Sequence, residues 1–201
     1  MTRVLWNAGW LVMTILAAVI ALSTGRYFFL SPDIATPPPL LEMVVQRNTL
    51  FLIHAAGGLI ALAAGAWNFL ERSRERFPNL RRWLGRVYLV SVFVSGVAGF
   101  SLAFTAQGGL AGRIGFGMLA VLWLTTASFA YVRIRGYDIE SHRRWMIRNY
   151  SLTFAAVTLR IWLVFLTGAG YDFPDAYAAV SWLSWVPNLI VAEIIAGPSR
   201  Q

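Results

Sequence analysis

Apolar residues dominate six long stretches of the chain, and most charged residues lie between them. The stretches cover about residues 5–26, 49–71, 84–106, 114–134, 145–167 and 177–196. Each is close to the roughly 20 residues with which an α-helix crosses the hydrocarbon core of a bilayer. The pattern therefore predicts an all-α fold, a polytopic transmembrane helix bundle of about six spans. We expect residues 1–201 to form a single transmembrane domain.

The distribution of charge predicts how this bundle is oriented. All 17 basic residues are arginine, and many lie in the connections after the second and fourth spans, "RSRERFPNLRRW" and "RIRGYDIESHRR". Because basic residues concentrate in cytoplasmic connections, these two connections and both termini are expected in the cytoplasm. The proline-rich connection at residues 27–48 then lies outside. Its segment "LLEMVVQR" is expected to form a short amphipathic turn on the outer surface.

Composition narrows the function classes. Hydrophobic residues make up 58% of the chain and charged residues 13%, with a net charge of +8. Since the arginines lie at the ends of spans, the expected partners are anionic lipid headgroups rather than nucleic acid. The chain has no cysteine, which excludes disulfides and thiolate metal sites. It also lacks the H-E-x-x-H, P-loop and G-x-S-x-G motifs and any paired carboxylates, so no catalytic residue is predicted and an enzyme is disfavoured.

One motif occurs twice. The pattern R-R-W-x-x-R-x-Y covers Arg81–Tyr88 and Arg143–Tyr150, and each copy opens a span from the predicted cytoplasmic side. The spacing predicts a two-hairpin internal repeat, in which spans two and three correspond to spans four and five. Arginines one helical turn apart beside a tryptophan are typical of contacts with anionic lipid, with a dedicated anion or partner site as the alternative. The predicted contact residues are Arg82, Trp83, Arg86, Arg144, Trp145 and Arg148.

These motifs resemble a known family. The segments "HAAGGLIALAAGAWNFL", "LRRWLGRVY", "HRRWMIRNYSLTFAAVTLR" and "WLSWVPNLIVAE" are similar to a family of predicted bacterial membrane proteins, the domain of unknown function 2306. The resemblance runs from His54 to Glu193. It implies a multi-helix architecture in the bacterial cytoplasmic (inner) membrane, and no particular activity. Where the family pattern has a histidine in the first cytoplasmic connection this chain has Arg81, which weakens any metal or haem role for that position.

Two polar residues stand inside the predicted spans. His54 and Arg160 both fall in the outer third of the membrane when residues are counted from the ends of their spans. One hypothesis places them across an outward-facing pocket, where they hold an anionic or carbonyl-bearing ligand such as a lipid headgroup or a quinone. In the alternative, Arg160 extends to the outer interface and pairs with Asp172, Asp175 or Glu42.

The second span presents small residues on the face of His54. Gly57, Gly58, Ala61 and Gly65 predict close packing against a matching stripe in the third span, which includes Ser95 and Gly99.

The two histidines cannot share a cofactor. His142 begins the fifth span from the opposite side, so its depth differs from that of His54 by roughly 20 Å or more at 1.5 Å per residue. A haem held by one histidine stays open but is disfavoured, and no metal site is predicted. Three functions therefore remain: a protein that binds or transports a small molecule, lipid or anion, a haem- or quinone-associated redox protein, and an accessory subunit of a larger membrane complex.

Overall fold

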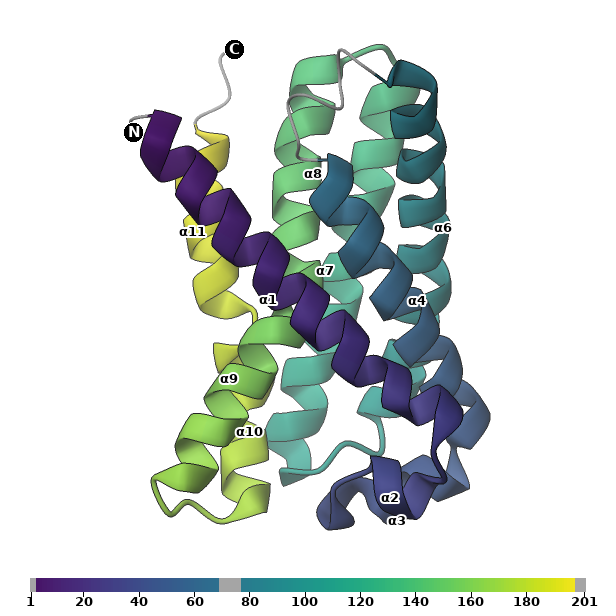
Figure 1. Ribbon diagram of the computed structural model, residues 1–201, viewed down its shortest axis with the longest axis vertical. Helices are drawn as coiled ribbons and strands as arrows, with labels where there is room; N and C mark the ends of the chain where they lie inside the picture. Colours follow the sequence, from purple (N-terminus) through teal and green to yellow (C-terminus); the bar gives the residue numbers. More distant parts are fainter. Residues whose placement is uncertain (1–2, 69–76, 198–201) are drawn as a thin grey trace.

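The computed structural model describes residues 3–68 and 77–197, and this part of the chain contains helices and no strand (Figure 1). Six helical segments are long and apolar enough to cross a membrane, which confirms the all-α prediction. The helices are α1 (Arg3–Phe29), α2 (Pro32–Ala35), α3 (Pro38–Gln46), α4 (Asn48–Asn68), α6 (Pro78–Ala103), α7 (Gly109–Arg135), α8 (Ile139–Thr153), α9 (Ala155–Gly168), α10 (Phe173–Leu183) and α11 (Val186–Ala196).

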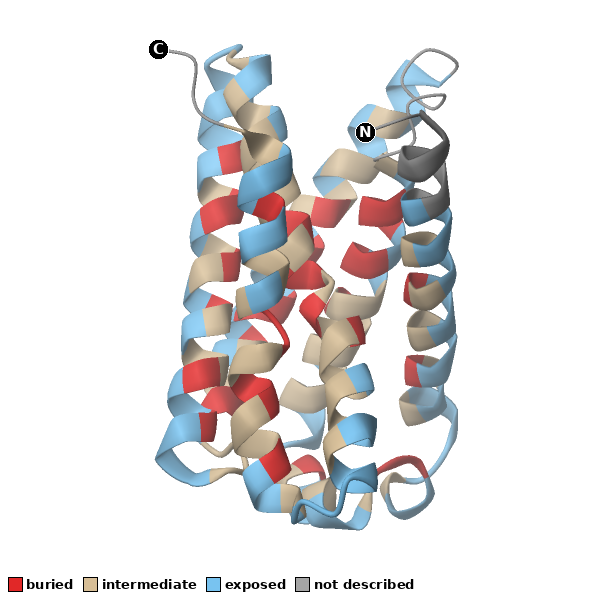
Figure 2. Cartoon of the chain, turned by 90° about the vertical axis from the view of Figure 1, so that its left-hand side faces the viewer, coloured by how far each residue is buried: buried red, intermediate tan, exposed pale blue. Residues whose placement is uncertain are grey.

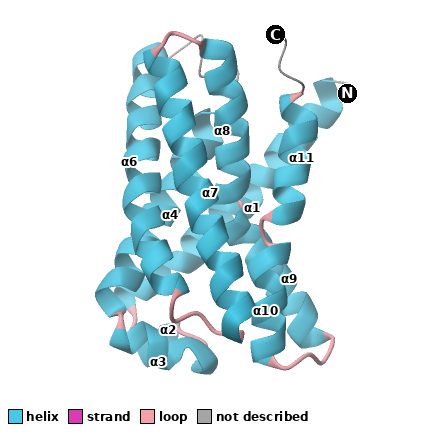
Figure 3. Cartoon of the chain, turned by 180° about the vertical axis from the view of Figure 1, so that it is seen from behind, coloured by secondary structure: helices cyan, strands magenta, loops and turns pink. Residues whose placement is uncertain are grey.

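Helices α4, α6, α7 and α8 form a bundle, and the remaining long helices lie against it. Helix α4 packs on α6, α6 on α7, and α7 on α8. Helix α1 crosses the molecule diagonally, while α9, α10 and α11 stand beside the bundle (Figures 1 and 3). The start of α1 and the end of α11 lie at one end of the molecule, and α2 and α3 lie at the other. The cytoplasmic location of the first end stays a prediction.

The fifth and sixth spans are each broken into two helices, which the apolar pattern does not reveal. The fifth breaks at Phe154, where the Thr153 hydroxyl donates 3.1 Å to the carbonyl of Asn149, and such bonds bend helices. The sixth breaks at Ser184 and Trp185, just before Pro187, whose ring nitrogen carries no hydrogen to continue the ladder.

Side chains donate hydrogen bonds to the Ser184 carbonyl at the second break. The Ser184 carbonyl receives hydrogen bonds from Thr158 Oγ1 at 2.5 Å and from Asn188 Nδ2 at 2.9 Å. Asn188 Nδ2 also donates 3.2 Å to the Ser151 carbonyl. Asn188 therefore ties the two broken spans together, which gives this intramembrane amide a structural role.

In the connection between α1 and α4, where the sequence predicts a short amphipathic turn, the structure has the helix α3. Helix α3 buries Val44 to 2% exposure, while Val45 is 56% exposed on its other side. Proline residues stand at the start of α3, where the missing backbone hydrogen has no intrahelical acceptor to lose.

The tyrosines that end the two copies of the repeated motif meet in the core. Tyr88 and Tyr150 are 0% and 3% exposed, and their ring centroids are 6.4 Å apart. Both rings pack against Gly65 of α4, where a Cβ atom would lie 2.9 Å from Tyr88 Cε2 and closer still to the Tyr150 ring. Figure 2 shows the buried positions gathered on the inward faces of the helices. This contact explains why α4 carries a glycine at that point.

Candidate functional site

A cavity of about 300 Å³ lies among the helices. Its walls come from α1, α4, α6, α7, α8, α9 and α10, and residues of the α3 region lie at its edge. Most of the lining consists of Leu, Ala, Gly, Phe and Met side chains. The polar lining residues are Thr24, Tyr27, His54, Trp123, Thr153, Arg160 and Tyr177.

His54 is held against α6 by Ser95. Its Nδ1 lies 2.9 Å from the Ser95 carbonyl oxygen, which can only accept, so Nδ1 carries the proton and donates it there. Ser95 Oγ lies 3.1 Å from the same nitrogen and donates 2.7 Å to the His54 carbonyl. The ring also touches Gly99, where a Cβ would lie 2.8 Å from Nδ1. A neutral imidazole in this position keeps its lone pair on Nε2 as a free acceptor at the cavity.

The close packing predicted between these two helices is confirmed. A Cβ at Gly57 would lie 2.7 Å from the Cβ of Ser95, so the backbones of α4 and α6 approach as closely as glycine allows. This approach is what brings Ser95 within reach of His54.

Arg160 enters the cavity from α9. Its Nη1 donates 2.7 Å to the Ala156 carbonyl, and its Nη2 donates 3.2 Å to Thr24 Oγ1 of α1. Because Ala156 lies one turn earlier in α9, the guanidinium points back along the helix and away from the α9–α10 turn. No ion pair among the described residues includes Arg160. The outward pairing with Asp172, Asp175 or Glu42 is therefore not what the structure shows.

Thr24, Tyr27 and Tyr177 also line the cavity and are not singled out by the sequence pattern, as is true of Trp123 and Thr153. Thr24 accepts from Arg160 and in turn donates 2.7 Å to the Ile20 carbonyl. Tyr27 packs edge-on against Phe51, with ring centroids 4.9 Å apart. Tyr177 comes from α10. A hydroxyl-bearing residue in an apolar span is a weak signal by itself, because the helices that bring these three together are far apart in the sequence.

A buried polar network closes one side of the cavity. Thr153 Oγ1 accepts from Trp123 Nε1 at 2.9 Å and lies 2.9 Å from the Tyr88 hydroxyl. That hydroxyl donates 2.5 Å to Asn149 Oδ1, while Asn149 Nδ2 donates 2.7 Å to Thr126 Oγ1 and 2.7 Å to the Trp123 carbonyl. Every hydrogen-bonding group of the Asn149 amide is thus satisfied, which suits a rigid wall.

The six residues predicted to contact lipid do not form one site. Arg82, Trp83 and Arg86 are exposed along α6, with Trp83 at 64% exposure. In contrast, Arg144 lies 3.4 Å from Glu140, and Arg148 binds Glu193 through two bonds of 2.6 and 2.7 Å.

The Trp145 ring also packs against other residues of the protein. Its ring stacks on Phe129 at a centroid distance of 4.7 Å, and the guanidinium of Arg148 lies 4.8 Å from its centroid. The second copy of the motif therefore makes contacts within the protein.

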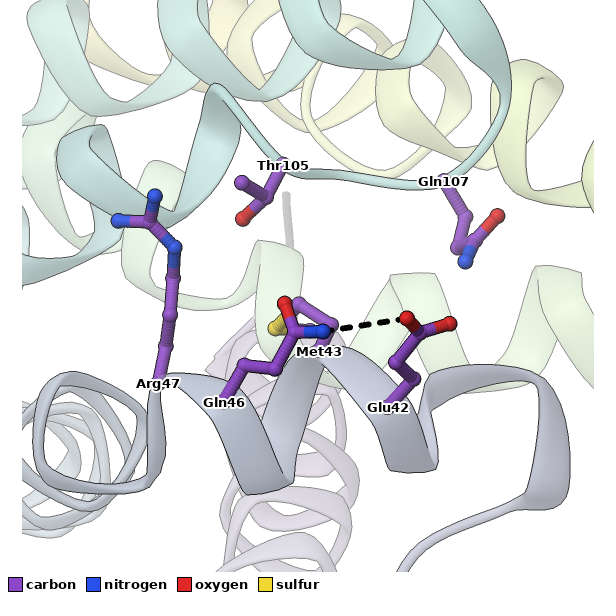
Figure 4. A pocket seen from close by; sticks show the side chains of 6 residues that line it. All are labelled: Glu42, Met43, Gln46, Arg47, Thr105 and Gln107. Atoms are coloured by element: carbon purple, nitrogen blue, oxygen red, sulfur yellow. Dashed lines mark hydrogen bonds between the residues drawn. The ribbon is translucent and has the colours of Figure 1, made fainter.

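Figure 4 shows a second and smaller pocket, of about 120 Å³, between α3 and the connection after α6. Gln46 Nε2 donates 3.1 Å to Glu42 Oε1 at its floor. Arg47 also lines this pocket, so its lining carries a positive and a negative side chain.

Few groups at the large cavity suit a metal. His54 is the imidazole among the described residues that line it, and no group of three His, Cys, Asp or Glu side chains that could hold a metal ion gathers in the described part of the chain. The volume is about twice the ~150 Å³ of a cavity that accommodates benzene.

The fold defines an integral membrane protein, an all-helical bundle with six apolar segments of membrane-spanning length around an interhelical cavity. The chain belongs to the family described as predicted membrane protein (DUF2306), whose profile matches residues 51–196. No curated protein and no solved structure matches the chain.

Proposed function

We propose that this chain binds a small amphipathic molecule in the cavity between Arg160 and His54, with the polar group of the ligand on Arg160. The observation that carries the proposal is an arginine that lines an apolar cavity without a counter-charge among the described residues. A charged side chain inside a bilayer is costly, by about 2.5–3.5 kcal/mol near the centre on insertion scales. Such residues commonly mark a binding site or a transport pathway.

The hydrogen bonds of Arg160 support this reading. A guanidinium has five N–H groups, and two of them reach Ala156 and Thr24, which are both neutral. The remaining donors are available to a ligand. The His54 ring lines the same cavity, and the apolar walls fit a hydrophobic body.

Native mass spectrometry of the chain released from its own membrane tests the proposal. We expect a small-molecule adduct on the wild type that falls about tenfold in Arg160→Gln, since charge-assisted hydrogen bonds would be lost. Arg113→Gln is the matched control, because Arg113 is an exposed arginine at the start of α7. A wild type without any adduct, or an equal adduct on Arg160→Gln, would refute the proposal.

Transport of the same ligand is a second candidate, favoured by the two broken spans. Discontinuous helices beside the substrate site are a recurring feature of transporters. Uptake of the adduct's ligand into vesicles that contain the protein would support transport, and binding without uptake would leave a binding protein.

We also propose that Arg82, Trp83 and Arg86 contact anionic headgroups at the cytoplasmic face of a bacterial inner membrane. Their exposure on one helix supports this role, at about 1 kcal/mol for each arginine. A redox protein with haem stays an alternative, and a Soret band in the purified protein would favour it.

A further inference from the structure

We infer that the ligand of this cavity is an apolar monocarboxylic acid, held by its carboxylate on Arg160. The inference rests on the proposed binding function and specifies the chemical class of the ligand. It is drawn from three properties of the cavity: its charge, the geometry of its donors and its size.

Charge separates an acid from a neutral ligand. None of the described residues that line the cavity is Asp or Glu, so the cation of Arg160 stands uncompensated in surroundings of low dielectric. A singly charged anion would neutralise it. A quinone or another neutral carbonyl compound would leave the charge in place, and a doubly charged phosphate would replace it with an excess of the opposite sign.

The donor geometry favours a carboxylate. Each Nη atom already donates one hydrogen bond within the protein, Nη1 to Ala156 of the same helix and Nη2 to Thr24 of α1. These bonds fix the plane of the guanidinium and leave further N–H groups for a ligand. A planar carboxylate accepts two parallel bonds from such a fork.

Tyr177 adds a hydroxyl group to the polar lining of the cavity. Tyr177 lines it, and its hydroxyl makes no hydrogen bond to another described residue. The ring is nevertheless held in place, since it lies 5.2 Å from the Phe116 ring and 5.3 Å from the Phe173 ring between centroids. Tyr177 and Arg160 line the same cavity, so this fixed tyrosine with its free hydroxyl is a second donor for an anionic oxygen.

Size and polarity describe the rest of the ligand. The cavity of about 300 Å³ has room for roughly two benzene-sized groups. Leu59, Leu119, Leu159 and Leu163 lie on its walls, so the body of the ligand is apolar. An inorganic anion or a sugar acid would leave these walls against water. A short-chain fatty acid or an aryl-alkenoic acid matches both requirements.

Isothermal titration of the full chain in detergent with cinnamate and with cinnamamide tests this inference. The two probes have nearly the same shape and differ in charge. We expect cinnamate to bind about tenfold or more tightly than cinnamamide, as two charge-assisted hydrogen bonds are gained. Arg160→Gln should abolish the preference, Arg160→Lys should retain part of it, and Arg113→Gln should leave it unchanged.

Arg160→Gln is expected to fold, because it removes a charge from the membrane interior, and its thermal unfolding confirms this before titration. Equal binding of cinnamate and cinnamamide would overturn the assignment of an acid and leave the cavity as a binding site for neutral molecules. If neither probe binds, the assignment of a monocarboxylic acid is also overturned. The adduct seen by mass spectrometry then decides separately whether the proposed binding function stands.

Discussion

Replacement of Gly65 by alanine tests the packing that holds the bundle together. A methyl group there would lie 2.9 Å from Tyr88 Cε2 and would overlap the Tyr150 ring more severely. Neither ring can turn aside freely. The Tyr88 hydroxyl is bonded to Asn149, and the Tyr150 hydroxyl donates 3.1 Å to the carbonyl of Leu62.

Opposing contributions to the free energy of unfolding determine how far Gly65→Ala destabilises the protein. Alanine favours a helix over glycine by about 1 kcal/mol. Overpacking of a filled core costs about 1–3 kcal/mol, and loss of a buried tyrosine hydrogen bond adds about 1 kcal/mol. We therefore expect Gly65→Ala to destabilise the protein by about 1–3 kcal/mol.

Thermal unfolding in detergent measures the difference against a matched control. Gly117 lies inside α7, and a Cβ there would meet nothing within 4 Å. Gly117→Ala should therefore be neutral or slightly stabilising. If Gly65→Ala unfolds at the same temperature as Gly117→Ala, the two tyrosines do not meet at this glycine and the described core is wrong.

Three further predictions concern the ends of the helices. Reporter fusions after Pro38 should report the outside and fusions after Glu140 the inside, and an inside signal at Pro38 would reverse the predicted orientation. Glutamine at Arg82 and Arg86 together should lower the retention of anionic lipid in the purified protein, and unchanged retention would indicate a protein partner for this surface. The backbone N–H of Ser141 in α8 donates a hydrogen bond of 3.0 Å to the Asp138 carboxyl and lowers its pKa, so the folded state favours the ionised carboxylate. The stability that Asp138 contributes is present above the pKa that its carboxyl has in the unfolded chain, and it is lost as the pH falls through the lowered folded value. The difference in melting temperature between the wild type and Asp138→Asn should therefore shrink in acid. A difference that stays constant with pH would contradict this role of the carboxyl.

Much of the architecture is readable from the apolar pattern. Six spans and close packing of α4 on α6 both follow from residue type and spacing. Counting depth along two spans also placed His54 and Arg160 at a similar level, and the structure sets both at one cavity. This prediction is possible because a polar or charged side chain inside a bilayer almost always faces the interior of the bundle or a cavity.

Other features depend on contacts between distant segments. The break at Phe154 has no glycine or proline to mark it, since it comes with a hydrogen bond of the Thr153 side chain. The direction of Arg160 is set by Thr24, which lies in the first span. Similarly, the sequence shows two like copies of an arginine motif, yet Glu193 engages only the copy that contains Arg148.

An experimental density map of the purified wild-type chain in lipid tests the central claim most directly. We predict density between the Arg160 guanidinium and Nε2 of His54 that no protein atom accounts for. We also predict that Arg160 keeps its bond to Thr24. A map in which Arg160 turns outward to pair with Asp172 or Asp175, or in which protein side chains fill the cavity, would contradict the account.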